Sequence, residues 1–338
     1  MAEFRTYEES RRHRPPPVWW TPTIDRKVLK ELMKRNNYQA FLSHGGYFLL
    51  LAAVGVVSAL LYQAGSLWAI LAFFVYGTLF GMSNSKVHES LHNTPFRISF
   101  LNEIVYYFAS AMEIRCPLST RWSHMNHHSY TIIRDTDLEI QAPRPVKLWK
   151  VLIEFFDLFS LPFLLRTLVL HTVGIPTKEA RRVVPQSEFW KVFWSSRFTL
   201  GLHLAVIALA IVLKSWLPIL FFTLPRLYGG WLIWALILVQ HSGLAEDVLD
   251  HRLNTRTIHL NPFLSFLYMH MEYHIEHHVF PTIPFHALAK FRRIVDSQMP
   301  KACTSLWDAF QELVPVLLKQ RHDPNFFIHR ELPDGGSA

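Results

Sequence analysis

Four apolar runs dominate the sequence and constrain its fold more strongly than any other feature. Each run is slightly short for the ~20 residues of a transmembrane helix, but its flanks can extend it. Only a few residues separate the members of each pair, which predicts two helical hairpins. The runs are Tyr47–Tyr62, Leu67–Met82, Phe198–Leu213 and Trp216–Val239. They predict transmembrane helices at about residues 44–63, 66–87, 197–214 and 216–240.

The two hairpins place the N-terminus, the central polar segment and the C-terminal segment on the same side of the membrane. The first 40 residues carry nine lysines and arginines, whereas the two tight turns carry only Lys214. Because positive charge accumulates on the cytoplasmic side, we expect all three polar segments, and both termini, in the cytosol. The prediction is an all-α integral-membrane protein, with four transmembrane helices in two hairpins under a cytosolic helical cap. We expect a single domain over residues 1–338, with a basic N-terminal segment at 1–37.

The composition agrees with a membrane protein and argues against other classes. Half of the 338 residues are hydrophobic, and the net charge is +8. The basic residues cluster beside apolar segments, which indicates attraction to lipid headgroups and not nucleic-acid binding. The two cysteines, Cys116 and Cys303, form no CxxC motif, which argues against zinc ribbons and thiol redox chemistry. Residues 1–37 contain no apolar leader, so we expect membrane insertion to use the internal segments.

Histidine clustering is the feature that points to chemistry. Eight of the 19 histidines form one HxxxH and two HxxHH motifs, and His241 follows the fourth apolar run directly. Residues three and four apart share one face of a helix, so each motif directs two or three imidazoles to one point. Only about 0.06 HxxHH matches are expected by chance at this composition. The clustered residues are His88, His92, His124, His127, His128, His274, His277 and His278.

Nine histidines are too many for one metal ion and suit two. A single catalytic zinc needs about three protein ligands, and these motifs contain no thiolate. Two iron ions with nitrogen-rich ligation, open to O2, are therefore favoured. Spacing alone leaves zinc or a mixed pair of metals open.

Carboxylates near the motifs are candidates to support the imidazoles through hydrogen bonds, a commoner role than direct ligation here. Those inside or beside the motifs are Glu89, Glu272 and Glu276. Glu246 and Asp247 follow His241, and they either support a ligand or form an ion-pair network that fixes the loop. The same alternatives apply to the acids after the second motif, which are Asp135, Asp137 and Glu139.

Two further residues are candidates for a substrate site. Arg226 lies in the fourth run beside Pro225, where it could pair with a substrate carboxylate or snorkel to the interface. Pro218, Pro225 and Arg226 together predict a kink or a break in this helix. His270 lies four residues before His274, so it could reach the same helical face.

The motifs HESLH, HMNHH and YHIEHHVFPTIP resemble those of the membrane fatty-acid desaturase/hydroxylase superfamily. The resemblance covers about residues 40–335. Three longer stretches, RWSHMNHHSYTIIRDTDLEI, QHSGLAEDVLDHRLNTRT and FFIHRELP, are similar to its bacterial rhizopine-oxygenase-like branch. The resemblance implies a mushroom-shaped fold in a bacterial inner membrane, two non-haem iron ions and O2 as oxidant. It also implies that all nine histidines, His241 included, are ligands.

The resemblance also implies external reducing equivalents, from a ferredoxin or Rieske-type protein with its NAD(P)H reductase. No HPGG motif of a fused cytochrome b5 is present, so we expect a separate donor. The expected reaction is hydroxylation or desaturation at an aliphatic C–H bond of a lipid-like or alkyl substrate. Alternatives are decarboxylation of a fatty acid to a terminal alkene and O-demethylation of a small molecule. A membrane metal transporter or receptor is less favoured, because the motifs lie outside the predicted spans.

Overall fold

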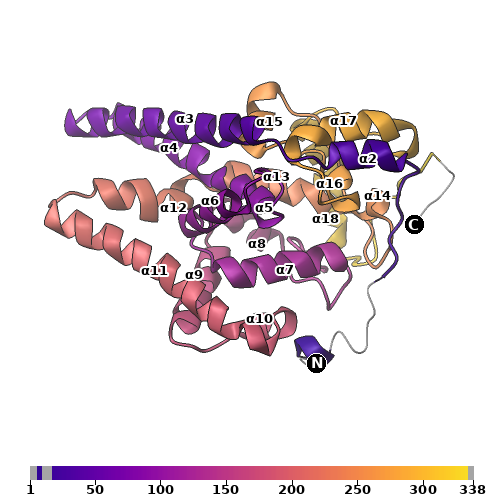
Figure 1. Ribbon diagram of the computed structural model, residues 1–338, viewed down its shortest axis with the longest axis horizontal. Coiled ribbons are helices and arrows are strands. Elements are labelled where there is room, and N and C mark those ends of the chain that lie inside the picture. Colours follow the sequence, from indigo (N-terminus) through magenta and orange to yellow (C-terminus); the bar gives the residue numbers. More distant parts are fainter. Residues whose placement is uncertain (1–5, 10–16, 334–338) are drawn as a thin grey trace. The chain divides into compact units, whose positions relative to one another are not determined.

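The computed structural model describes residues 6–9 and 17–333, and its regular secondary structure is helical (Figure 1). Within this part of the chain, β-type pairing is limited to two isolated bridges, Thr257 with Tyr273 and Ile258 with Cys303. The arginine- and proline-rich portion of the predicted basic segment, residues 10–16, lies outside the described residues. The prediction of an all-α chain is therefore confirmed for the described residues.

The chain divides into two compact units. The first comprises residues 1–35, 122–151 and 236–338, and the second comprises residues 36–121 and 152–235. Both units are built from segments that are far apart in the sequence. The expectation of a single domain stays a prediction.

The second unit contains the long apolar helices. In it, α3 packs against α4, α4 against α12, α5 against α6, and α11 against both α6 and α9. The larger helices of this unit are α3 (Asn37–Gln63), α4 (Trp68–Gly81), α5 (Ser83–Leu91), α6 (Ser99–Met112), α9 (Ser160–Thr172), α10 (Lys178–Val183) and α11 (Phe189–Val212). The shorter elements are η1 (Glu154–Phe156), η2 (Gln186–Glu188), the π-helix η3 (Ile219–Thr223) and α12 (Pro225–Gly229).

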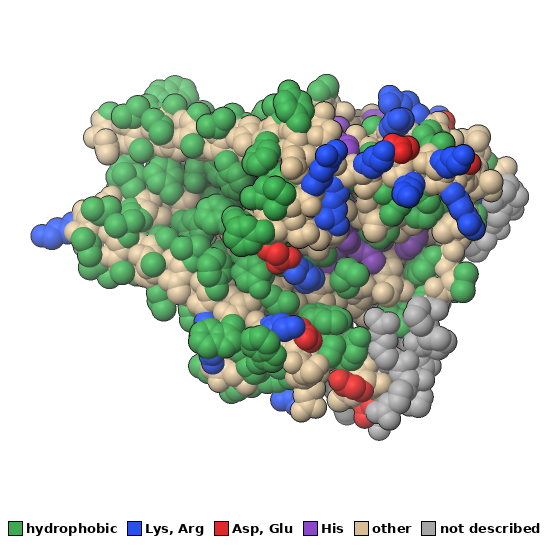
Figure 2. All heavy atoms as spheres, viewed as in Figure 1, with side chains coloured by type: hydrophobic (Ala, Val, Ile, Leu, Met, Phe, Trp, Pro, Cys, Tyr) green, Lys and Arg blue, Asp and Glu red, His purple; other side chains and the backbone are tan. Residues whose placement is uncertain are grey.

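Two helical stretches of the described chain are long and apolar enough to cross a membrane, judged by length and composition. They are Arg26–Gln63, which includes α3, and Gln186–Val212, which includes α11. Most residues of these apolar stretches are not buried; Leu49, for example, retains 74% of its surface. Figure 2 shows such hydrophobic side chains gathered over this apolar part of the chain. An apolar surface of this extent is stable only against lipid or another apolar partner.

The second and fourth predicted spans differ from continuous helices. The second is interrupted at Met82, where α4 ends and the polar helix α5 begins. The fourth consists of the π-helix η3, the short helix α12 and the apolar helix α13 (Trp231–His241). Proline lacks a backbone N–H and cannot continue the hydrogen-bond ladder, so α12 starts at Pro225. The predicted break in the fourth run is confirmed.

Two glycines allow α4 and α12 to cross at very short range. A Cβ atom added to Gly229 would lie 1.9 Å from the backbone carbonyl carbon of Gly77, far inside van der Waals contact. Small residues are the usual device for close approach of apolar helices in membranes. The position of the broken helix α12 therefore depends on Gly77 and Gly229.

The variant Gly229→Ala is expected to lose about 1–3 kcal/mol of stability, because the added methyl group has no space and the two helices must separate. Thermal unfolding of the detergent-purified protein measures this. The matched control is Gly201→Ala on α11, where an added Cβ meets no atom within 4 Å. Equal thermal stability of the two variants would contradict the close crossing.

The first unit is a set of shorter helices around a continuous apolar core. Leu32 of α2 packs there with Ile275 of α16 and with Leu288, Phe291 and Val295 of α17. The helix α16 thus lies against the same core as α2 and α17. The helices are α2 (Arg26–Leu32), α7 (Pro117–Ser129, from residue 122), α8 (Leu148–Ile153, to residue 151), α13 (from residue 236), α14 (His251–Asn254), α15 (Pro262–Tyr268), α16 (His274–Val279), α17 (Phe285–Val295) and α18 (Leu306–Gln320).

Candidate metal centre

Seven of the nine predicted histidines lie together in the first unit, on three helices. The second motif forms the last turns of α7, His241 is the final residue of α13, and the third motif forms most of α16. Each motif is helical, so its imidazoles emerge from one face, as the spacing predicts. The seven imidazoles form two groups.

The buried group consists of His127, His241, His274 and His278. One nitrogen atom from each of the four lies within 4.8 Å of the others. His274 is at its centre, because its Nε2 atom lies 3.1 Å from Nε2 of His241 and 3.1 Å from Nε2 of His278. All four residues are buried, with 2–4% of their surface exposed.

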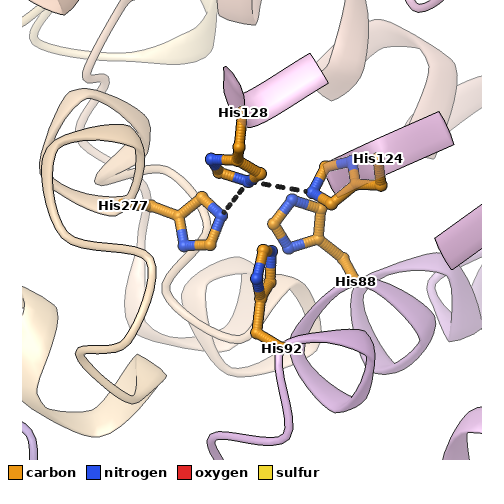
Figure 3. A group of neighbouring side chains, drawn as sticks. All are labelled: His88, His92, His124, His128 and His277. Atoms are coloured by element: carbon orange, nitrogen blue, oxygen red, sulfur yellow. Dashed lines mark hydrogen bonds between the residues drawn. The ribbon is translucent and has the colours of Figure 1, made fainter. Parts of the chain in front are cut away.

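The second group in this unit is formed by His124, His128 and His277. Figure 3 shows the three rings turned toward one another, with His128 in the middle. The Nε2 atom of His128 lies 3.0 Å from Nε2 of His124 and 3.1 Å from Nε2 of His277. His88 and His92, also drawn in Figure 3, come from α5 in the second unit, and their ring centroids are 5.3 Å apart.

The spacing of these nitrogen atoms fits metal ligation. Imidazole nitrogens bind a transition-metal ion at about 2.1 Å, so two ligands that meet at a right angle are about 3.0 Å apart. The Nε2 separations in both groups have this value. Burial also lowers the pKa of His274, His277 and His278 well below the usual value, with a smaller contribution from neighbouring histidines. These imidazoles are therefore neutral, which is the protonation state that binds a metal.

Hydrogen bonds at Nδ1, on the side of the ring away from the neighbouring imidazoles, orient four of the rings. Nδ1 of His127 lies 2.7 Å from a carboxylate oxygen of Asp137, and Nδ1 of His124 lies 3.0 Å from Glu139. Nδ1 of His241 lies 3.0 Å from the carbonyl oxygen of Asn254. An oxygen that accepts from Nδ1–H fixes the tautomer and leaves the Nε2 lone pair for a metal. The remaining ring is His278, whose Nδ1 is 3.2 Å from Oγ1 of Thr131.

The two carboxylates set the electrostatics behind the rings. Burial lowers the pKa of His127, but the charge and hydrogen bond of Asp137 outweigh burial and raise the pKa above its usual value. Burial would raise the pKa of Glu139, yet His124 and His127 lower it to about 2. A carboxylate that accepts from Nδ1–H raises the basicity of the ring and so strengthens its electron donation to a bound cation.

The loop that carries these carboxylates is itself tightly held. Asp137 accepts hydrogen bonds from the backbone N–H groups of Ile132 and Glu139, both at 2.8 Å. Ile132 and Asp135 have positive φ angles of 54° and 59°, so the loop turns sharply after α7. The turn brings Asp137 back to His127, ten residues earlier in the chain.

The variant Asp137→Asn is expected to weaken metal binding about 10- to 100-fold, because the amide cannot accept all three hydrogen bonds that fix His127 and the loop. Chelator competition on the metal-loaded protein measures the affinity. Asp135→Asn is the matched control, since Asp135 is exposed and asparagine tolerates its left-handed backbone. An affinity of Asp137→Asn equal to that of the control would exclude support through His127.

Glu246 and Asp247 correspond to the ion-pair alternative considered from the sequence. Glu246 pairs with Arg144 at 3.0 Å, and Asp247 binds both the backbone N–H and the side chain of Arg134. The backbone N–H of Asp247 also donates to the carbonyl of Ile132. These contacts join the loop after His241 to the loop after the second motif. The side chains of these four paired residues line an open cavity of about 770 Å³.

The acids in and beside the motifs contact other polar side chains of the surrounding helices. Glu276 is fully buried, accepting from Thr257 at 2.6 Å and pairing with Arg292 at 2.9 Å. Glu272 accepts a hydrogen bond from Ser265. Glu89, on α5, accepts from Thr94 at 2.9 Å.

The two candidate substrate-site residues have other partners. The guanidinium of Arg226 pairs with Asp157 and, at 2.9 Å, with Glu113. These contacts argue against both roles considered from the sequence, binding of a substrate carboxylate and snorkelling. His270 is partly exposed, and its Nδ1 lies 2.9 Å from the hydroxyl of Ser265. It lies outside the two histidine groups.

Sequence reasoning did not find two further residues beside the centre. His251 is buried. The centroid of its ring lies 5.1 Å from that of His278, and the ring stacks on Trp19 at a centroid distance of 4.0 Å. Asn254, three residues later, supports His241 through its backbone carbonyl. A lone histidine and a backbone oxygen carry no motif, so no local pattern marked them.

The fold and the centre define a class: a helical, largely apolar protein with clustered histidines able to hold metal ions. Comparison with known families then places it. The family model of the fatty acid desaturases matches residues 65–310. The chain is also 23% identical over 237 residues to a Δ5 fatty acid desaturase of Caenorhabditis elegans, an alignment covering 60% of this chain. It spans about half (51%) of that relative.

This chain belongs to the fatty acid desaturase family. The histidine groups agree with the histidine boxes of that family.

Proposed function

We propose that this protein is an O2-dependent diiron oxidoreductase that attacks an aliphatic C–H bond of an acyl or alkyl substrate. The observation that carries the proposal is the convergence of seven imidazoles in two groups, with Nε2 spacings of 3.0–3.1 Å and oxygen acceptors on Nδ1. The proposal assigns all nine predicted histidines as ligands, including His88 and His92 of α5, as the sequence motifs indicate. When bound, two iron ions would supply the reductive activation of O2 for C–H cleavage.

The chain's own contribution is to hold and shield the centre. Asp137, Glu139 and the carbonyl of Asn254 keep three imidazoles in the tautomer that presents Nε2. Burial of the four-histidine group keeps bulk water away, which protects a reactive site from side reactions. The exposed apolar surfaces of α3 and α11 support access of a lipid-like substrate from the bilayer.

The proposed setting is a bacterial inner membrane with four spans in two hairpins and with both termini and the centre in the cytosol. The continuous helices α3 and α11, the pair α4–α5, and the interrupted series η3, α12 and α13 would supply the spans. Electrons would come from a ferredoxin or Rieske-type protein with its NAD(P)H reductase.

Metal analysis tests the proposal directly. The protein is purified in detergent from cells grown on the Mössbauer-active iron isotope, and its metal content and Mössbauer spectrum are recorded. Two iron ions per chain are expected. Full occupancy by zinc under iron-replete growth would overturn the mechanism based on O2.

Product analysis then distinguishes the possible reactions. The nematode relative is a Δ5 fatty acid desaturase, which favours an acyl substrate and an alkene of unchanged length. An alcohol would identify hydroxylation, a shortened terminal alkene with CO2 would identify decarboxylation, and loss of a methyl group would identify O-demethylation. The assay needs the iron-loaded protein, O2, a reduced ferredoxin and a set of acyl and alkyl substrates.

A further inference from the structure

A basic surface covers one side of the first unit. Figure 2 shows lysine and arginine side chains gathered in the region where Figure 1 places α2 and α17. We call this surface the α2–α17 basic face. Its exposed members are Arg26, Lys27, Lys30, Lys34, Lys290 and Arg293.

Three nearby acids, Asp25, Glu31 and Asp296, offset part of the charge of the six exposed basic side chains. Glu31 pairs with Lys34 at 2.6 Å, and Asp296 pairs with the buried Arg292 at 2.8 Å. The side chain of Asp25 accepts hydrogen bonds from the first turn of α2 as its N-cap. The remaining exposed lysines and arginines give the face a clear positive charge, which attracts an acidic partner over about a Debye length.

The rear of the basic face contacts the helix that carries the third histidine motif. Leu32 of α2 and Phe291 of α17 share one apolar core with Ile275, the neighbour of His274. Phe291 also lies 5.6 Å from Phe280, between ring centroids, and Arg292 pairs with the buried Glu276 on α16 at 2.9 Å. Packed helices have axes about 8–10 Å apart, so the face is one helix layer from the histidines of α16.

We propose that the α2–α17 basic face docks an acidic one-electron carrier protein that reduces the metal centre. This inference rests on the proposed function, which requires such a carrier. Desaturation combines one CH–CH pair, one O2, two electrons and two protons to give one alkene and two water molecules. Two reduced carriers, each oxidised by one electron, supply the balance and must bind close to the centre one after the other.

The apolar sides of the two helices favour a protein over a lipid surface as the occupant. An interfacial helix turns its apolar side into the bilayer. Here α2 turns Leu32 into the core, and α17 turns Leu288, Phe291 and Val295 into it. The apolar residues left outside are few and partly exposed, such as Val28 at 37% and Ile294 at 42%. A charged surface with little apolar area is typical of transient redox complexes.

Direct binding tests the proposal. The as-purified full chain in phosphatidylcholine nanodiscs is titrated with an acidic plant-type [2Fe–2S] ferredoxin at low salt. Two variants each reverse two charges: Lys27→Glu with Lys30→Glu, and Lys290→Glu with Arg293→Glu. The matched control is Lys319→Glu with Arg321→Glu, at exposed positions at the end of α18. Each variant changes the net charge by the same amount.

The expected result is at least a tenfold loss of ferredoxin affinity in both face variants, and less than a twofold change in the control. Ferredoxin binding by the unchanged protein should also weaken as the salt concentration rises. Unchanged ferredoxin binding in both face variants would overturn the proposal. If the same variants also lose a preference for phosphatidylglycerol over phosphatidylcholine bilayers, the face would be assigned to lipid headgroups.

The readouts separate this inference from the proposed function. Iron content and Mössbauer spectra of the face variants should equal those of the unchanged protein. Two iron ions with no ferredoxin binding at this face would overturn the docking site and leave the diiron proposal intact. Zinc in place of iron would overturn the proposed function, whatever the binding data show.

Discussion

Replacing His274 with alanine is expected to lower the iron content from two ions to about one and to reduce product formation by at least about 1000-fold, since a lost metal removes several kcal/mol of transition-state stabilisation. His274 is the central member of the four-histidine group, with Nε2 atoms of two other histidines at 3.1 Å. Its loss therefore removes a neighbour of two of the other three ligands in that group. Metal analysis and product yield measure the effect.

The control for this variant is His322→Ala, which removes an exposed histidine in the same unit. It should retain both iron ions and full activity. The reciprocal variant His128→Ala should empty the other group, because His128 lies between His124 and His277. Full iron content in His274→Ala would show that the four-histidine group is a packed cluster and not a metal site.

The second large effect is expected at Arg226. Replacing it with methionine leaves two carboxylates, Glu113 and Asp157, buried without their cation. Removing one partner of a buried ion pair costs about 3–5 kcal/mol, and here one arginine serves two acids. We therefore expect Arg226→Met to lower the thermal stability strongly in detergent, or to prevent isolation of folded protein.

Neutralising the partners distinguishes this structural role from substrate binding. Arg226→Met combined with Glu113→Gln and Asp157→Asn removes all three charges together, and it should recover most of the lost stability. A substrate role predicts another pattern. Arg226→Met alone would then have the thermal stability of the unchanged protein. Its KM for an acyl acid would rise by tenfold or more, while kcat stayed unchanged.

The histidine groups were predictable because their geometry is mostly local. Spacings of three and four residues put His124, His127 and His128 on one face of α7 whatever the rest of the chain does. The same holds for the motif on α16. The break in the fourth run was equally local, since Pro225 cannot continue a helical hydrogen-bond ladder.

The supporting carboxylates were harder to identify because they depend on a loop. Asp137 reaches His127 through a turn in which Ile132 has a positive φ angle, and nothing in the spacing distinguishes it from Asp135. Both were considered as supports from the sequence. Glu246 and Asp247 seemed equally well placed after His241, yet both pair with arginines of another loop.

The partners of Arg226 could not be predicted, because they are distant in the sequence. Glu113 and Asp157 precede it by 113 and 69 residues. Their contact with Arg226 depends on how α6, η1 and α12 pack. The close crossing of α4 and α12 could not be predicted for the same reason. It depends on two glycines that are far apart in the sequence, and neither glycine alone indicates it.

The way in which the histidines are gathered has a consequence for the lifetime of the protein in the cell. His128 and His277 are 149 residues apart, and His241 and His274 are 33 apart, so bound iron would tie distant segments together. Free iron at 1000 times its dissociation constant would add about 4 kcal/mol to the stability of the folded chain. Chains made during iron starvation would lack this and would unfold and be degraded faster. The amount of protein would then follow the iron supply, without any change in synthesis.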